Sequence, residues 1–175
     1  MLARRNRIGD KKTMMDKFLR ADELGIRLEI VGGLPIWEAH PVMKHQLAID
    51  RIRATIKQEP ASNDEDCACF HVSDVYVHFP DGSLKRPDIA IFCRKPDEEE
   101  EAVTLVPEAV VEVISKGYEA KDLVIGPQFY LAQNVKDVVV FNPYTLLVIH
   151  VRRDGVRHLA SPAEIQLECG CRCVV

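Results

Sequence analysis

The sequence predicts a mixed α/β (α+β) domain with one central sheet flanked by helices, and three observations support this fold class. Short runs rich in Val and Ile, which are typical of strands, alternate with segments whose apolar residues recur at helical spacing. The run 109–115 is apolar almost throughout, as expected of a central strand that is covered on both faces. The 175 residues, 47% of them hydrophobic, suffice for one sizeable core, and no repeat or linker divides them.

The first part of the chain predicts a basic tail, a helix, a hairpin and a second helix, in that order. Thr13 and Asp16 resemble a capping box at the start of the first helix, and Gly25 is suited to its end. Gly32-Gly33 suits a tight turn between two short strands, and Pro41 suits the first turn of the second helix. The expected ranges are 1–12 for the tail, 13–25 and 41–59 for the helices, and 27–31 and 34–39 for the strands.

The rest of the chain predicts a sheet and one further helix. Val75, Val77 and Phe79 alternate with polar residues, as in a strand with one buried face, and Pro127 suits the start of a helix. The expected strands are 67–79, 88–93, 109–115, 137–141 and 145–151, and the expected helix is 127–134. Residues 13–175 are therefore expected to form a single domain that follows the basic tail.

Charge is unevenly distributed, although the whole chain carries a formal net charge of only −4. Residues 1–20 hold seven basic and two acidic side chains, whereas residues 97–101 are all acidic. Such segregation could steer a polyanion such as DNA towards the basic end, and the alternative is a solvated tail without a partner. No apolar run approaches the ~20 residues that span a bilayer. The charged N-terminus does not resemble a signal peptide, so we expect a cytoplasmic protein with no membrane partner.

The six cysteines are clustered in the sequence, at positions 67, 69, 93, 169, 171 and 173. In an intracellular protein we expect them to be reduced. Cys67, Cys69 and His71 would share one face of a strand, and together with the CGCRC segment they could build a zinc site. The spacing contains no CxxC pair, which favours the alternative of ordinary buried thiols.

Two apolar runs each carry a single carboxylate, Asp88 in KRPDIAIFC and Glu112 in PEAVVEVIS. Because burying an unpaired carboxylate is costly, each strand either turns that face to water or places a cation there. The two strands are close in sequence and are expected to be neighbours, so both carboxylates can reach one point. Such a pair suits a hard divalent cation, with the backbone carbonyl of Val113 as a further ligand. The alternative is that Asp88 caps a turn and Glu112 faces solvent on an edge strand.

Several segments in the same order resemble a known family. RPDIAIF and PEAVVEVIS are followed by Asp122 and then by Tyr130 ahead of VKDVVVFNP. Upstream, LEIVGG is similar to a Glu-x-x-x-Gly hairpin, and His45 is similar to a histidine that opens a helix. This order resembles the Uma-two family of PD-(D/E)xK endonucleases, and the resemblance covers roughly residues 26–152.

The resemblance implies a restriction-endonuclease-like fold and a nuclease that uses Mg²⁺ (or Mn²⁺) to hydrolyse phosphodiester bonds in DNA. It also implies that Asp88 and Glu112 are the metal ligands and that Glu29 is a further acidic residue of the site. Glu29 could instead lie on an exposed face of its hairpin, and His45 could be a helix histidine satisfied by a neighbour. Tyr130 is interpreted as a packing residue. A homodimer would supply the two sites that are needed to cut both strands.

The lysine of the nuclease motif is missing from both places where the resemblance would put it. The position two residues beyond the second carboxylate is Ile114, and the alternative position in the next helix is Gly126. Lys116 and Lys121 are the candidates, because a long lysine side chain can reach back to a site. Lys121 is favoured because it lies in the connector that carries the lysine in the resembled family, and Gln128 is a weaker substitute. The ammonium group of the lysine would orient the attacking water and stabilise negative charge. Otherwise both lysines are exposed loop charges and the site is impaired.

The sequence therefore supports three functional hypotheses. The first is a Mg²⁺-dependent DNA endonuclease in which Asp88, Glu112, Glu29 and one of the two lysines act together. The alternative is a catalytically impaired protein of the same fold that acts as a nucleic-acid-binding or interaction module. The third is a structural homodimer without a nucleic-acid role, which the basic N-terminus disfavours. Lys85 and Arg86 either contact phosphate or are ordinary turn charges.

Overall fold

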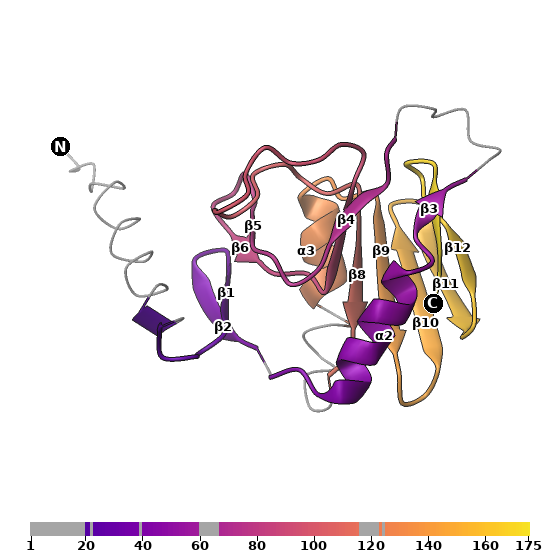
Figure 1. Ribbon diagram of the computed structural model, residues 1–175, viewed down its shortest axis with the longest axis horizontal. Coiled ribbons are helices and arrows are strands. Elements are labelled where there is room, and N and C mark those ends of the chain that lie inside the picture. The colour runs from indigo at the N-terminus through magenta and orange to yellow at the C-terminus, as the bar shows by residue number, and fades with distance from the viewer. Residues whose placement is uncertain (1–19, 22, 39, 60–66, 116–122, 124) are drawn as a thin grey trace.

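The computed structural model describes residues 20–21, 23–38, 40–59, 67–115, 123 and 125–175, and its main feature is a six-stranded sheet (Figure 1). The strand order is β11-β10-β9-β8-β7-β4. The strands are β4 (Phe70–Val72), β7 (Ile89–Phe92), β8 (Ala109–Val113), β9 (Asp137–Asn142), β10 (Leu147–Arg152) and β11 (Gly155–Ala160). Neighbours are antiparallel except β8 and β9, which are parallel, so the predicted mixed sheet is confirmed.

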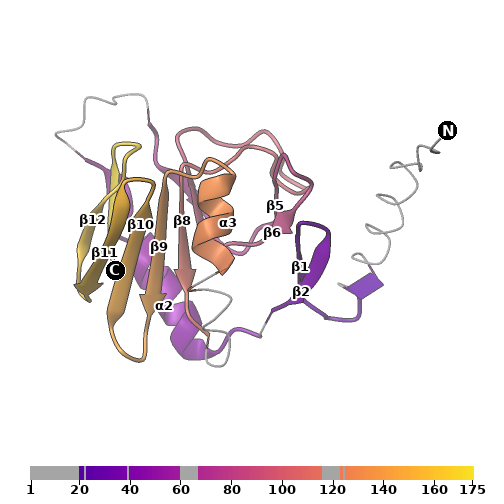
Figure 2. The ribbon, with the colours of Figure 1, turned by 180° about the vertical axis from the view of Figure 1, so that it is seen from behind.

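A helix packs on each face of the central sheet. Helix α2 (Met43–Arg53) packs on one face through Ala48, Ile49 and Ile52. Helix α3 (Gly126–Ala132) packs on the other through Phe129 and Tyr130, and Figures 1 and 2 show the two helices on opposite sides. All five residues of β8 are buried between them, as predicted from the apolar run. Parallel strands need a crossover connection, and α3 lies in the connection between β8 and β9.

Two smaller sheets accompany the main one. Their orders are β2-β1-β6-β5 and β12-β13-β3. The bounds are β1 (Leu28–Val31), β2 (Leu34–Trp37), β3 (Lys57–Gln58), β5 (Val77–His78), β6 (Leu84–Lys85), β12 (Glu164–Gln166) and β13 (Cys171–Val174). Gly32 and Gly33 join β1 to β2 with φ angles of 56° and 84°, which glycine adopts without steric cost and which tight hairpin turns require. The predicted hairpin is therefore confirmed.

Two predicted elements were too long. The second helix ends at Arg53 rather than Glu59, and Lys57–Gln58 instead forms β3, which pairs with β13. The strand expected over 67–79 is divided into β4 and β5, which belong to different sheets. Between them Asp74 has a left-handed φ of 59°. A single left-handed residue redirects the strand without disturbing the alternation of apolar and polar residues, so the sequence pattern did not reveal the break.

The basic tail and residues 13–19 and 22 of the first predicted helix lie outside the described residues, as do Lys116, Lys121 and Asp122. The predicted helix after them and the next two strands are confirmed as α3, β9 and β10. Among the residues that the structure describes, no helix is long and apolar enough to cross a membrane.

The cysteines gather at one place beside the central sheet. Four of them are paired as Cys67–Cys93 and Cys69–Cys171, and Cys169 and Cys173 are free and buried. The prediction of six reduced thiols is therefore wrong for this form of the protein. The fold accounts for the proximity, because β4 pairs with β7 and the amide of Ala68 donates to the carbonyl of Cys93 at 2.8 Å.

Candidate active site

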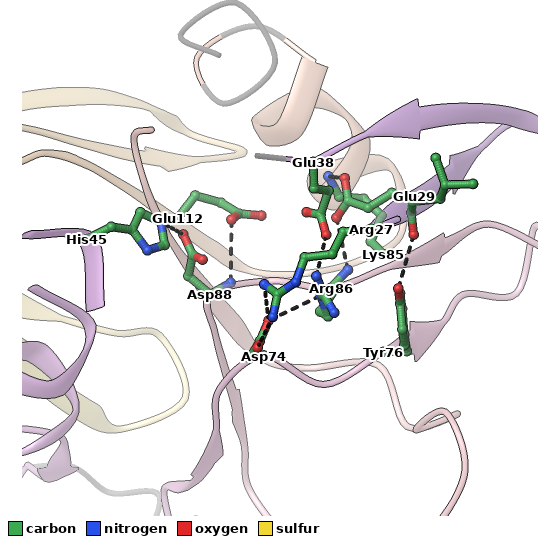
Figure 3. Close-up of polar contacts among 11 residues, drawn as sticks. Arg27, Glu29, Glu38, His45, Asp74, Tyr76, Lys85, Arg86, Asp88 and Glu112 are labelled. Atoms are coloured by element: carbon green, nitrogen blue, oxygen red, sulfur yellow. Dashed lines mark hydrogen bonds and ion pairs between the residues drawn. The ribbon is translucent and has the colours of Figure 1, made fainter. Parts of the chain in front are cut away.

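Asp88 and Glu112 lie opposite each other at one end of the β7–β8 pair (Figure 3). Ile89 pairs with Val111 in this antiparallel register, and the next position along it places Asp88 against Glu112. The amide of Asp88 lies 3.5 Å from Oε2 of Glu112, and the amide of Val113 donates to Oδ2 of Asp88 at 2.7 Å. The prediction that the two strands are neighbours is confirmed. The two carboxylates therefore meet where β7 begins and β8 ends.

The two carboxylates differ in exposure. Glu112 is buried, at 7% relative exposure, and β8 is an interior strand, so the alternative of a solvent-facing Glu112 on an edge strand is wrong. The side chain of Asp88 retains 21% exposure. The site is thus enclosed on the Glu112 side and reachable from solvent on the Asp88 side.

His45 on α2 belongs to this site. Its Nε2 atom lies 3.2 Å from Oδ2 of Asp88, and its side chain is 8% exposed. The sequence offered His45 either as a counterpart of the histidine that opens a helix in the resembled family or as a helix histidine satisfied by a neighbour. The two interpretations agree with each other, since the neighbour that it contacts is Asp88. The helix that packs on one face of the sheet thus holds the Asp88 carboxylate from that side.

Tyr130 on α3 holds the other carboxylate, which the sequence interpretation of a packing residue missed. Its hydroxyl donates to Oε1 of Glu112 at 2.5 Å. The ring also packs against Phe79 and Phe129, with centroid separations of 6.0 and 5.5 Å. Burial raises the pKa of the Tyr130 hydroxyl well above its usual value, and the charges of Glu112 and Glu29 raise it further. The phenol therefore stays protonated and acts as a neutral hydrogen-bond donor. Its place in the family resemblance was the only sequence signal for this role.

Glu29 and Lys85 form a buried ion pair next to Tyr130. Lys85 Nζ lies 3.0 Å from Oε2 of Glu29, and each side chain is 1% exposed. Oε1 of Glu29 accepts a hydrogen bond from the amide of Arg86 at 2.9 Å. Lys85 Nζ also lies 5.0 Å from the centre of the Tyr130 ring. The alternatives of an exposed Glu29 and of Lys85 as an ordinary turn charge are therefore wrong.

Arg86 is tied to two acidic residues on the outer side of this pair. Its guanidinium group lies 3.0 Å from Glu38 and 3.1 Å from Asp74, and Arg27 lies 3.1 Å from the same Asp74 carboxylate (Figure 3). Glu29 lies in β1 and Glu38 immediately follows β2, so their ion pairs with Lys85 and Arg86 fasten the β1–β2 hairpin to the segment that leads into Asp88. Neither basic residue is a simple surface charge.

The donor set fits a hard divalent cation. Asp88 and Glu112 offer carboxylate oxygens and Val113 offers a backbone carbonyl, which are the ligand types that Mg²⁺ and Mn²⁺ take in proteins. Asp88 accepts a hydrogen bond from the Val113 amide and Glu112 accepts one from the Tyr130 phenol, and neither of these uncharged donors cancels the negative charge. Two adjacent carboxylates repel each other unless a cation lies between them, so the arrangement favours a bound ion.

The described structure does not supply the missing motif lysine. Ile114 is buried at 2% exposure, and Gly126 is the first residue of α3. Lys116 and Lys121 lie outside the described residues. Within the described part of the chain, Lys85 is the lysine that joins the contacts of the site, through Glu29 and the ring of Tyr130.

A mixed sheet with a helix on each face, and a carboxylate pair where two adjacent strands meet, define a protein of the restriction-endonuclease-like class. The chain belongs to the Uma2 family, described as "Putative restriction endonuclease", which its residues 15–168 match. The family resemblance of the sequence is thereby confirmed.

A solved structure shares the fold. It is the crystal structure, at 1.96 Å resolution, of a "putative nuclease" belonging to DUF820 from Anabaena variabilis ATCC 29413. The two chains are 18% identical with a TM-score of 0.63, and the match covers 86% of this chain and 87% of that one. No curated protein matches the chain. At this level of identity the structural likeness establishes the fold, which is that of a nuclease-like protein.

Proposed function

We propose that this protein is a metal-dependent endonuclease that hydrolyses phosphodiester bonds in DNA with Mg²⁺ or Mn²⁺. The observation that carries the proposal is the Asp88–Glu112 pair, held opposite each other at the end of two adjacent strands. Membership of the Uma2 family supports a nuclease. The partial exposure of Asp88 supports access from solvent, which a phosphodiester substrate needs.

The chain's own residues would act mainly by positioning. Asp88 and Glu112 would hold the cation, with the carbonyl of Val113 as a further ligand. When bound, the cation would lower the pKa of a coordinated water and neutralise charge on the phosphate. Tyr130 fixes the Glu112 carboxylate, and the Val113 amide and His45 fix Asp88. Their contacts set the ligand geometry before any substrate binds.

Glu29 and the lysines have different parts in this proposal. Glu29 contributes indirectly, because it forms the buried pair with Lys85 beside Tyr130 and its charge helps to raise the pKa of the Tyr130 hydroxyl. Lys121, or else Lys116, would bring the ammonium group that orients the attacking water. Lys85 is a positioning residue, because its buried ion pair with Glu29 keeps it from reaching a substrate.

The test is cleavage of supercoiled plasmid DNA by the purified protein with Mg²⁺ or Mn²⁺. Asp88→Asn and Glu112→Gln preserve side-chain shape while removing charge, and each should lower metal-dependent nicking by about 10²-fold or more. Asp97→Asn is the matched control, since that side chain is 89% exposed on a distant loop. Cleavage that survives both site substitutions would refute the assignment. Lys116→Ala and Lys121→Ala, compared side by side, would then identify the lysine.

The second candidate function is a nucleic-acid-binding module without catalysis. The observation in its favour is that Ile114 and Gly126 occupy both expected lysine positions. This candidate predicts that labelled duplex DNA binds, with an affinity that falls steeply as salt rises, while neither Mg²⁺ nor Mn²⁺ produces cleavage. Cleavage that depends on Asp88 and Glu112 would exclude it.

A homodimer remains part of the proposal, because cutting both strands of a duplex needs two sites. Light scattering coupled to size-exclusion chromatography, with and without a DNA duplex, measures the mass of the particle. A dimer that forms only on DNA would agree with two-strand cleavage. A monomer under both conditions would restrict the protein to single-strand nicking.

A further inference from the structure

The six cysteines come from three distant segments that meet beside the central sheet, and the sulfur atoms of five of them form one group, here called the cysteine cluster. Cys67 and Cys69 immediately precede β4, Cys93 immediately follows β7, and the other three lie on or beside β13. The pairing of β4 with β7 and the packing of β13 against the same apolar core bring these segments together. The sequence had suggested Cys67, Cys69 and the CGCRC segment as one zinc site, whereas the place of Cys93 beside them follows from the pairing of β4 with β7.

The sulfur atoms lie at distances suited to a single metal ion. The two disulfides approach each other at Cys67 and Cys171, whose Sγ atoms are 3.5 Å apart. Two trios have all their sulfurs within 4.8 Å of one another, Cys67–Cys69–Cys171 and Cys67–Cys93–Cys169, and they share Cys67. A tetrahedral zinc ion with Zn–S bonds of ~2.3 Å separates its sulfur ligands by about 3.8 Å. The first trio therefore already lies within the span of the ligands of one zinc ion, and Cys93 and Cys169 lie within 4.8 Å of its member Cys67.

The cysteine cluster offers sulfur ligands, and His71, the nitrogen ligand that the sequence had suggested beside them, is engaged elsewhere. The ring of His71, which the sequence placed beside Cys67 and Cys69, instead contacts the carbonyl of Cys69 through Nδ1 at 3.0 Å. Every cysteine except Cys93 is buried. An all-sulfur, water-excluded set selects Zn²⁺ over the hard cations that suit Asp88 and Glu112.

We propose that the reduced form of the cysteine cluster is a zinc site, in which Cys67, Cys69 and Cys171 are ligands and one thiolate of the second trio is the fourth. Each disulfide accepts two electrons and two protons from a dithiol reductant, which becomes a disulfide itself. Zn²⁺ then displaces the protons of the four thiols as it binds. The disulfide form in the structure is the oxidised, metal-free state of the same cluster.

This site is separate from the candidate active site. Asp88 immediately precedes β7 and Cys93 immediately follows it, so the two sites lie at opposite ends of one strand, roughly 17 Å apart by strand rise. Zinc would tie β4, β7 and β13 together without touching the carboxylates. The proposal therefore stands whether or not the protein cleaves DNA.

The test uses the full-length protein purified with a dithiol or phosphine reductant, supplied with Zn²⁺, and freed of loose metal by dialysis against a chelating resin. Elemental analysis should give about one zinc per chain. Replacement by Co²⁺ should give the intense thiolate charge-transfer and visible bands of a tetrahedral sulfur site. A reduced protein that keeps no zinc overturns the proposal, and so does a protein that contains iron with a visible chromophore.

Variants locate the ligands. Cys67→Ser and Cys171→Ser should each lower zinc content at least several-fold, whereas Cys173→Ser, which belongs to neither trio, and Asp88→Asn should keep it. Loss in either Cys93→Ser or Cys169→Ser names the fourth thiolate, and full retention in both overturns four-sulfur coordination. Because a ligand variant could fail to fold, the wild-type protein supplies an independent readout. Titration with an organomercurial should release zinc in step with thiol modification, and release before any thiol reacts would overturn the proposal.

Discussion

At the residue scale, the site depends on how two like charges are held together. Asp88 accepts a hydrogen bond from a backbone amide and Glu112 accepts one from a phenol. Both donors are uncharged, so they fix the carboxylate oxygens without neutralising them. Tyr130 performs this function because burial and neighbouring carboxylates raise the pKa of its hydroxyl, which keeps the proton on the donor.

Tyr130→Phe tests that hydrogen bond directly. The substitution keeps the ring that packs against Phe79 and Phe129 and removes the donor to Glu112. We expect metal-dependent cleavage to fall by about 10–100-fold, the usual contribution of a residue that orients a metal ligand. The measurement is the initial nicking rate as a function of metal concentration. Tyr144→Phe, at a half-exposed tyrosine, is the control, and equal rates for the two variants would contradict the role.

At the element scale, two buried clusters of charged side chains link strands to one another. One is the Glu29–Lys85 pair, which fastens the β1–β2 hairpin to β6. The other surrounds Asp137 at the start of β9, where His150 Nε2 lies 2.6 Å from one oxygen, Arg152 contacts the same oxygen and the Glu168 amide donates to the other. In both clusters a carboxylate is buried only because several donors from other elements surround it.

Removing only one partner of the Glu29–Lys85 pair should destabilise the fold strongly. Lys85→Met leaves a buried carboxylate, and Glu29→Gln leaves a buried ammonium while keeping an acceptor for the Arg86 amide. Each should lower the free energy of unfolding by about 3–5 kcal/mol. In the double variant the loss of unfolding free energy should be clearly smaller than the sum of the two single losses. Urea unfolding of wild type, the two single variants and the double variant would measure these values. Lys136→Met, at a half-exposed pair, should cost no more than about 1 kcal/mol.

Asp137 gives a dependence of stability on pH. Burial alone would raise the pKa of its carboxyl, but the hydrogen bonds from His150, the Glu168 amide and Arg152 outweigh burial and lower it below the usual 3.8. A lowered folded-state pKa contributes stability above the unfolded value, and that stability is lost as the pH falls through the folded value. Asp137→Asn should therefore lower the free energy of unfolding by about 3 kcal/mol at pH 7.

The same comparison at low pH provides the control for Asp137. The difference in unfolding free energy between wild type and Asp137→Asn should narrow as the pH falls from 3.8 to the lower folded-state pKa, because over this range the carboxyl of the unfolded wild-type chain takes up a proton while that of the folded protein stays ionised. Urea unfolding curves at several pH values would measure it. A difference that stays constant down to acid pH would show that the ionised form does not provide the stabilisation.

These clusters mark the limit of what the sequence could predict. Asp88 and Glu112 could be predicted because each is a lone carboxylate in an apolar run. The partner of Glu29 could not, since Lys85 is 56 positions away and meets it only through the pairing of β1 with β6. The two-residue strand β3 was missed for a similar reason, because its pairing with β13 is set by the fold and not by local alternation.

At the scale of the whole molecule, the candidate site joins elements from both faces of one sheet. His45 comes from α2 on one face, Tyr130 from α3 on the other, and the carboxylates from the strands between them. Fold class, central strand and carboxylate pair could all be derived from periodicity and motif. The choice of which helix covers which face could not, because either helix has an apolar side that would fit.

A cation bound between elements of both faces should stabilise the whole fold. Ligand that binds only the folded state adds about 2.7 kcal/mol when its concentration is 100 times the dissociation constant. We expect the melting temperature of wild type to rise with added Mg²⁺ or Mn²⁺ and that of Asp88→Asn/Glu112→Gln to stay constant. Without metal, the double variant should be at least as stable as wild type, because two repelling charges are gone. Equal responses of the two proteins to metal, measured by calorimetry, would contradict the site.

The Cys69–Cys171 disulfide has a topological consequence for the oxidised protein. It joins positions 102 residues apart, so the segment between them becomes a ring that contains both carboxylates, α3 and all six strands of the central sheet. A single backbone cut at any turn inside that ring opens it without releasing a piece. The oxidised molecule can therefore be cut at such a turn and remain one covalent body, with one new pair of chain ends at the cut.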